Sequence, residues 1–135
     1  MKPSNRPYRT AVLLTTAAML WPAVQAATPA ELLTGYSAQA GTAASPQRGE
    51  QFFNAPHGKE WSCASCHSAA PTQAGKHAST GKPIGALAPS ANAQRFSDAA
   101  KVEKWFRRNC NDVLGRECSP TEKADVMSWL IGFKS

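Results

Sequence analysis

The pentapeptide Cys63-Ala64-Ser65-Cys66-His67 constrains this chain more than any other feature of its sequence. Two cysteines separated by two residues and followed at once by histidine form the C-x-x-C-H motif that attaches haem c. At this spacing the two thiols lie about one helical turn apart, so each can form a thioether with one of the two vinyl groups of a haem. The imidazole of His67 then faces the iron as its proximal ligand. The motif therefore predicts one covalently attached haem, with Cys63 and Cys66 as its anchors.

Three other uses of the cysteines are compatible with their number. Cys63 and Cys66 alone can form a dithiol redox site, but such sites accompany a βαβ pattern that this sequence does not show. A zinc site can combine them with Cys110 and Cys118. Two disulfides are the third alternative, with three possible connectivities. An export signal, helical patterning and a long irregular segment all favour haem over these alternatives.

The first 26 residues read as a cleaved secretory signal peptide. Lys2, Arg6 and Arg9 are followed by an apolar stretch from Ala11 to Trp21, which is too short to span a bilayer. Val24-Gln25-Ala26 is a small-x-small cleavage site, so we expect a single exported domain over residues 27–135. The route is typical of bacterial export and indicates the periplasm, an oxidising compartment. No other segment has the eighteen or so apolar residues of a membrane span, and we expect a soluble mature protein.

The mature segment shows helical signals at both ends and an irregular middle. Residues 68–94 are rich in Ala, Gly, Pro, Ser and Thr and show no strand pattern. A compact domain rarely tolerates so long an irregular stretch, which becomes reasonable if the stretch wraps a large apolar ligand. Cys110 to Cys118 is predicted as a short loop. Four helices are predicted: from the Thr28–Glu31 capping box to Gly41, from Ser45-Pro46 through Phe53, from Ser97 as N-cap through Arg108, and from the Ser119–Glu122 capping box to Phe133.

The fold class follows from these helices and the motif. Gly49 and Phe53 on an early helix, and Trp129 on the last helix, resemble the helix crossing of class I cytochromes c, where glycine permits close backbone approach. We therefore predict an all-α, class I cytochrome c-like fold around one haem, with an extra N-terminal helix.

Four residues are candidates for the position opposite His67. Met127 lies in the middle of the last helix, beside Val126 and Leu130, and is predicted to be core packing. His57 and His77 lie in flexible loops and are predicted to be solvated. Asn109 follows Trp105 by four residues and so projects from the same helical face. The residues alone leave two roles for it, an iron ligand or a helix C-cap.

The remaining cysteine pair, Cys110 and Cys118, is expected to form a disulfide in an oxidising compartment. Closing so short a loop stabilises a domain by about 2–3 kcal/mol on the chain-entropy account. The bridge would also stiffen the segment that carries Asn109.

Several segments together identify a family resemblance that covers nearly all of the mature chain. The chain closely resembles the sphaeroides haem protein family, whose members are class I-like c-type cytochromes. The residues that carry the resemblance are Asn109-Cys110-Asn111, residues 113–118, residues 122–125, Arg95-Phe96 with residues 102–105, and the stretch from Gly81-Lys82 to Ser90.

The resemblance implies specific roles. Asn109 becomes the distal ligand of the ferric iron, and it leaves on reduction so that O₂, NO or another small molecule can bind. The family disulfide falls on Cys110 and Cys118. A related cytochrome, c″, has histidine where this chain has Asn109, so a bis-histidine site is disfavoured. The implied redox partners are a dihaem cytochrome c and a membrane cytochrome b. Reductase or dioxygenase-like chemistry, and pure electron transfer, both stay open.

The net charge does not point to nucleic acid. Fifteen Lys and Arg against nine Asp and Glu give a formal charge of +6. Loss of the signal peptide removes three basic and no acidic residues, which leaves +3, and two haem propionates would lower it further. No Lys/Arg run resembles a phosphate-binding stripe.

Overall fold

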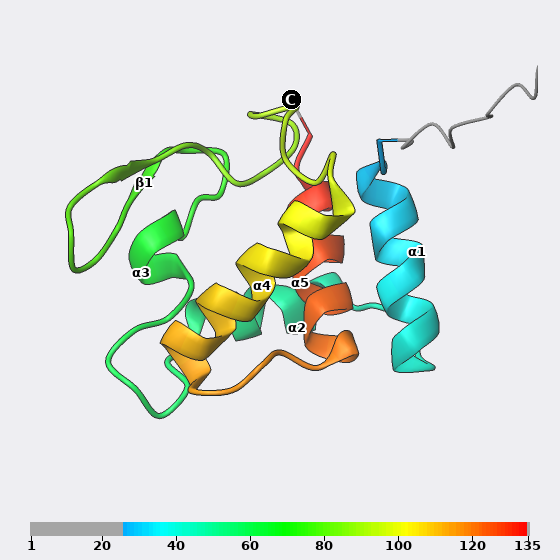
Figure 1. Cartoon of the computed structure of the whole chain (residues 1–135), viewed down its shortest axis with the longest axis horizontal. Helices are drawn as coiled ribbons and strands as arrows, with labels where there is room; N and C mark the ends of the chain where they lie inside the picture. Colours follow the sequence, from blue (N-terminus) through cyan, green and yellow to red (C-terminus); the bar gives the residue numbers. More distant parts are fainter. Residues whose placement is uncertain (1–25, 135) are drawn as a thin grey trace, which may run out of the picture.

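The computed structural model describes residues 26–134, and it shows a helical domain with one small hairpin (Figure 1). Except for Ala26, the predicted signal peptide lies outside the described residues. Within residues 26–134, no helix is both long enough and apolar enough to cross a membrane. The elements are α1 (Pro29–Ala40), α2 (Pro46–Asn54), α3 (Ala64–His67), β1 (Gly75–Lys76), β2 (Pro83–Ile84), α4 (Ala99–Leu114) and α5 (Pro120–Gly132).

The predicted helix starts at the two ends of the domain are confirmed by their caps. The side chains of Thr28 and Ser119 each accept a hydrogen bond from the backbone amide of a glutamate three residues later, and the carboxylate of that glutamate accepts one from the backbone amide of the cap residue. These reciprocal bonds satisfy amide groups that have no partner inside the helix. Ser45 caps α2 by accepting from the Arg48 amide. Each of these helices also has proline at its start, where no amide hydrogen is needed.

The core forms where α2 crosses α5, and the close approach predicted from Gly49 is present there. A Cβ placed on Gly49 would collide with the backbone carbonyl of Asp125. Phe53 lies against Trp129 with ring centroids 5.0 Å apart. Met127 is completely buried, as predicted for a core side chain. Phe53, at this crossing, also lies near His67 of the C-x-x-C-H motif, so the core and the motif are in contact.

The extra N-terminal helix, α1, packs on the opposite side of the domain from α3 and the hairpin (Figure 1). Its buried residue, Tyr36, meets Phe106 of α4 edge-to-face, with ring centroids 5.7 Å apart. The ammonium group of Lys123, from α5, lies over both rings and is also paired with Glu103 of α4. Three helices thus meet at one aromatic and charged contact.

The position of α4 differs from the prediction at both ends. Its N-cap is Asp98, which accepts from the Lys101 amide, while the Ser97 hydroxyl instead bonds the Gln94 carbonyl. The helix also continues beyond Arg108 to Leu114 and ends at Gly115, whose φ of 74° is left-handed. Glycine adopts this conformation without the steric cost that other residues meet. The predicted loop from Cys110 to Cys118 is therefore wrong in its first half, which is helical.

The irregular middle of the chain contains one short hairpin that the sequence pattern did not predict. β1 and β2 are antiparallel, with Gly75 opposite Ile84 and Lys76 opposite Pro83. Strands of two residues are too short to show the alternation by which strands are recognised. A Cβ on Gly75 would collide with the Cys66 carbonyl, so the hairpin lies directly on α3.

Candidate haem site

Of the two motif cysteines, Cys66 lies in the single turn of α3 and Cys63 is its N-cap, and the two are not bonded to each other. The His67 amide donates to the Cys63 carbonyl at 3.1 Å. The sulfur of Cys66 accepts a hydrogen bond from the Ala78 amide of the hairpin at 3.2 Å. Burial raises the pKa of Cys63 to about 11, so its thiol is protonated at neutral pH. The structure therefore presents two half-buried thiols that are not bonded to each other, at the start and within the single turn of α3.

His67, the next residue, has the properties of a ligand histidine. Burial, followed by the positive charge of Arg95, lowers its pKa to about 4, so the imidazole is neutral at physiological pH. Its ring lies beside Phe53, with centroids 6.3 Å apart. Within the described part of the chain, its Nδ1 atom is buried without a hydrogen-bond partner. A neutral imidazole is the form that binds metal, and together with two thiols it forms a donor set that fits a covalent haem.

Asn109 lies inside α4 and not at its end. Because the helix runs on to Leu114, the alternative role of Asn109 as a C-cap is wrong. The side chain is half-buried, and among residues 26–134 no hydrogen-bond partner is found for its carboxamide. Trp105, one turn earlier on the same face, is 44% exposed, and the guanidinium of Arg108 lies 5.2 Å from the centre of its ring. This face of α4 thus carries the Asn109 carboxamide beside a partly exposed Trp105 ring, one side of which is covered by the guanidinium of Arg108.

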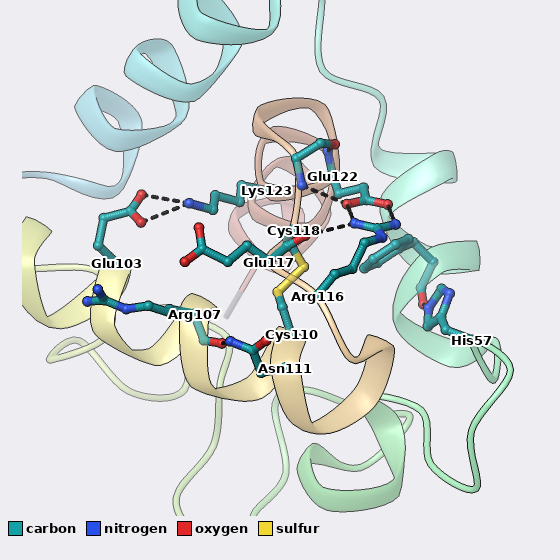
Figure 2. Close-up of a disulfide and its surroundings, with 12 residues drawn as sticks. His57, Glu103, Arg107, Cys110, Asn111, Arg116, Glu117, Cys118, Glu122 and Lys123 are labelled. Carbon is teal, nitrogen blue, oxygen red and sulfur yellow. Dashed lines mark hydrogen bonds and ion pairs between the residues drawn. A yellow bond between two sulfur atoms is a disulfide. The ribbon is translucent and has the colours of Figure 1, made fainter.

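A disulfide joins Cys110 in α4 to Cys118, immediately before the N-cap of α5 (Figure 2). The two Cα atoms are 5.6 Å apart, and both residues are buried. The bridge therefore ties the residue after Asn109 to the start of α5. It also excludes the zinc alternative that needs all four cysteines, because two of them are bonded to each other.

The two remaining histidines are engaged by nearby groups. The Nε2 atom of His57 is 2.7 Å from the Phe52 carbonyl, and its ring lies against that of Phe52. The Nδ1 atom of His77 accepts from the Thr80 amide and lies 3.2 Å from the Ser79 hydroxyl. Each histidine is thus part of its own local turn.

Arg95 has no site role in the sequence prediction, where it only helps to carry the family resemblance. Its charge acts on His67 although the two residues are far apart in sequence. Its guanidinium donates to the backbone carbonyls of Gly85 and Ala86. No sequence pattern predicts that these carbonyls lie beside Arg95.

Comparisons with known proteins agree with this geometry. A family model described as a domain of unknown function (DUF1924) matches residues 39–130. The cytochrome c-type protein SHP of Cereibacter sphaeroides is 48% identical over 126 residues, which cover 90% of this chain and 97% of that protein.

Two solved structures are similar to the whole domain. Oxidised SHP, described as an oxygen-binding cytochrome c, matches with a TM-score of 0.72 and 50% identity, over 76% of this chain and 95% of the other. Oxidised cytochrome c″ from Methylophilus methylotrophus matches with a TM-score of 0.70 and 41% identity, over 79% and 95% of the two chains. The predicted all-α cytochrome fold is confirmed. The chain belongs to the SHP family of monohaem c-type cytochromes, which carry covalently attached haem c.

Proposed function

We propose that this protein is a periplasmic cytochrome c that exchanges electrons and binds small ligands such as O₂ or NO in its ferrous state, with Asn109 as a redox-labile distal ligand. The observation that carries the proposal is the unpartnered carboxamide of Asn109 beside the exposed ring of Trp105. The carboxamide is half-buried and its polar atoms stay accessible, so an iron bound on this side could take it as a ligand. The description of SHP as an oxygen-binding cytochrome c supports the same assignment.

Cys63, Cys66 and His67 have separate roles in this proposal. Cys63 and Cys66 would hold the haem through two thioether bonds, each formed by adding a thiol S–H across one vinyl group, so attachment would need no oxidant. His67, held neutral by burial, is the proximal ligand. When bound, the haem would supply a one-electron iron centre. Phe53 and the Gly75 contact hold the proximal side in place.

Asn109 controls the distal position. A carboxamide oxygen is a hard, weak ligand that prefers ferric to ferrous iron. Reduction therefore favours release of Asn109, which frees the position for a small ligand. Because the side chain stays on the same helical face, its amide group can then donate a hydrogen bond to that ligand.

The location and partners belong to the same proposal. The signal peptide over residues 1–26 directs export to the periplasm, where the Cys110–Cys118 disulfide is stable. Electrons are exchanged with a dihaem cytochrome c and a membrane cytochrome b. A reductase or dioxygenase-like activity on O₂ or NO is the enzymatic form of this function, and a pure electron carrier is the alternative.

Optical spectra of ferric and ferrous protein, before and after exposure to air, test the assignment. We expect Asn109→Ala to change the ferric spectrum to that of an open or water-bound site. Asn111→Ala is the matched control, because the Asn111 side chain donates to the Arg107 carbonyl on the helix itself. An unchanged ferric spectrum in Asn109→Ala excludes the ligand role. A low-spin, air-stable ferrous wild type favours the electron carrier, and a negative pyridine haemochrome assay excludes haem altogether.

A further inference from the structure

A groove of about 190 Å³ lies between α1 and the first turns of α4, far from α3 and the hairpin (Figure 1). Sites for drug-sized ligands hold roughly 300–1,000 Å³, so a groove of this size suits a small molecule with few atoms. The proposed haem site uses none of its residues. Those that line it include Glu31, Leu32, Gly35 and Tyr36 of α1 and Ala99 and Glu103 of α4.

Two small residues keep the groove open. A Cβ placed on Gly35, in the middle of α1, meets no atom within 4 Å. Glycine is an unfavourable residue inside a helix, and neither a left-handed backbone nor a close packing contact requires it at this position. Ala99 lines the wall that belongs to α4. The space therefore exists because large side chains are missing at these two positions, and a larger side chain at position 35 would occupy it.

The hydroxyl group of Tyr36 is buried at this groove without a partner. Only 4% of the residue is exposed, and within residues 26–134 its oxygen forms no hydrogen bond. Burial, followed by the nearby Glu103 carboxylate, raises the pKa of Tyr36, so the hydroxyl keeps its proton. A buried polar group without a partner is uncommon in folded proteins. The Glu103 side chain beside it is 46% exposed and can move to admit a ligand that supplies the missing partner.

The groove also carries a net negative charge. Hydrogen bonds from Thr28 lower the pKa of Glu31, so its carboxylate is ionised at neutral pH. Both bonds end on the Oε2 atom, at 2.8 Å each, and Oε1 accepts none in the described part of the chain. Glu103 is paired with Lys123 at 2.8 Å, whereas no cation among the described residues pairs with Glu31. The charge of Glu31 is therefore left for a cationic ligand to compensate.

We propose that this groove binds a small organic cation, a free primary alkylammonium whose short apolar chain lies in the space beside Gly35. This inference goes beyond the proposed function and does not depend on it. An ammonium group has three N–H donors and no acceptor. Oε1 of Glu31 and the oxygen of Tyr36 are acceptors to which no group of the described chain donates. An anion of the same size would be repelled by Glu31, and a neutral molecule would gain only the apolar contacts.

The test is a nuclear magnetic resonance titration of the nitrogen-15-labelled holoprotein with n-pentylammonium chloride at neutral pH. We expect the amide signals of α1 and of the start of α4 to shift and to reach saturation. n-Pentanol and n-pentanoate have the same carbon chain and should bind at least several-fold more weakly. Equal affinity for pentanol would overturn the cation assignment. The optical spectrum of the haem should not change, and shifts confined to the surroundings of α3, with a changed spectrum, would place the amine on the iron and contradict the proposal.

Gly35→Leu is the blocking variant, because leucine occupies the groove and is also a better helix former than glycine. We expect this variant to fold like the wild type and to lose measurable binding of n-pentylammonium. Gly132→Leu is the matched control, since Gly132 is also helical and a Cβ there meets no atom within 4 Å. The control should bind like the wild type. If Gly35→Leu binds as well as Gly132→Leu does, the groove is not the site and the proposal is wrong.

Tyr36→Phe tests the head group without filling the groove. Because the hydroxyl has no partner in the protein, its removal should leave the urea midpoint unchanged or slightly higher. Binding of n-pentylammonium should weaken several-fold, and binding of n-pentanol should not change. An unchanged affinity for the ammonium would overturn the role of Tyr36.

A lysine side chain of another protein carries the same ammonium group, and a second probe distinguishes it from a free amine. Nα-acetyl-lysine amide presents this group on a peptide backbone, which the small groove has little space to hold. We expect it to bind more weakly than n-pentylammonium. Tighter binding would assign the groove to a protein partner and overturn the proposal of a free amine.

Discussion

Gly49 of α2 lies so close to the backbone carbonyl of Asp125 in α5 that no side chain fits between them. The contact brings the two helices together at their crossing, where Phe53 then reaches Trp129 on one side and His67 on the other. The position of His67, the proposed proximal ligand, therefore depends on a glycine in a different helix. Close packing of this kind is sensitive to the addition of a single methyl group.

Gly49→Ala should destabilise the domain by about 1–3 kcal/mol, because the added methyl forces the helices apart. Urea unfolding of the holoprotein measures the change. Gly35→Ala is the matched control, since a Cβ at Gly35 meets no atom within 4 Å and alanine is the better helix former. We expect that control to be neutral or slightly stabilising. Equal losses in the two variants would show that the crossing is not the cause.

The features that the sequence predicted well are those written in local patterns. The capping boxes at Thr28 and Ser119 and the C-x-x-C-H motif each occupy a few consecutive residues, and the structure contains both caps as expected. The close approach at Gly49 was predicted from the resemblance of Gly49, Phe53 and Trp129 to the helix crossing of class I cytochromes c, and it is present. In each case the physical cause lies within the segment or on one of its faces.

The features that sequence reasoning missed depend on distant or opposing signals. The Cys110 and Cys118 spacing suggested a loop, but the helix stop that decides the end of α4 is Gly115. Recognising that glycine as a C-terminal signal would have placed Asn109 inside the helix. Arg95 is different, because the orientation of its guanidinium depends on the Gly85 and Ala86 carbonyls, which come close to it only in the folded loop.

Removal of the Cys110–Cys118 disulfide should lower the free energy of unfolding by about 2–3 kcal/mol, because the unfolded chain without the bridge has more conformational freedom. The double variant Cys110→Ser/Cys118→Ser, compared with wild type in urea unfolding, measures this. The bridge also holds the residue after Asn109, so we expect faster exchange of added cyanide or azide at the ferric site. Stability loss with unchanged ligand exchange would mean that the bridge does not position Asn109.

The ion pair between Arg116 and Glu122 should make stability depend on pH in the acid range (Figure 2). The hydrogen bond from Arg116 is the largest cause that lowers the pKa of Glu122 below its ordinary value of 4.5. A carboxylate with a lowered pKa in the folded state contributes stability above the unfolded pKa, and this contribution is lost as the pH falls through the folded pKa. We expect the urea midpoint of Glu122→Gln to depend less on pH between pH 3 and 5 than the midpoint of the wild type does.

Comparing Glu122→Gln with Arg116→Gln separates the effect of the ion pair on stability from the effect of the helix cap. Glutamine at position 122 can still accept from the Ser119 amide. Arg116→Gln also leaves the cap intact, and it removes the pair together with the hydrogen bond from Arg116 to the Glu117 carbonyl. Both single variants and the double variant should have the same shallow acid profile. Additive effects in the double variant would show that the two side chains act independently.

Asn109→His should convert the ferric haem from a weak-field to a strong-field site. Imidazole binds both ferric and ferrous iron more firmly than a carboxamide oxygen does. We therefore expect a low-spin ferric electron paramagnetic resonance signal and carbon monoxide binding to the ferrous protein at least several-fold slower than in wild type. Asn111→His tests specificity, since its side chain belongs to the exposed part of the same helix. The distal assignment fails if Asn109→His keeps the wild-type spin state, or if both variants change alike.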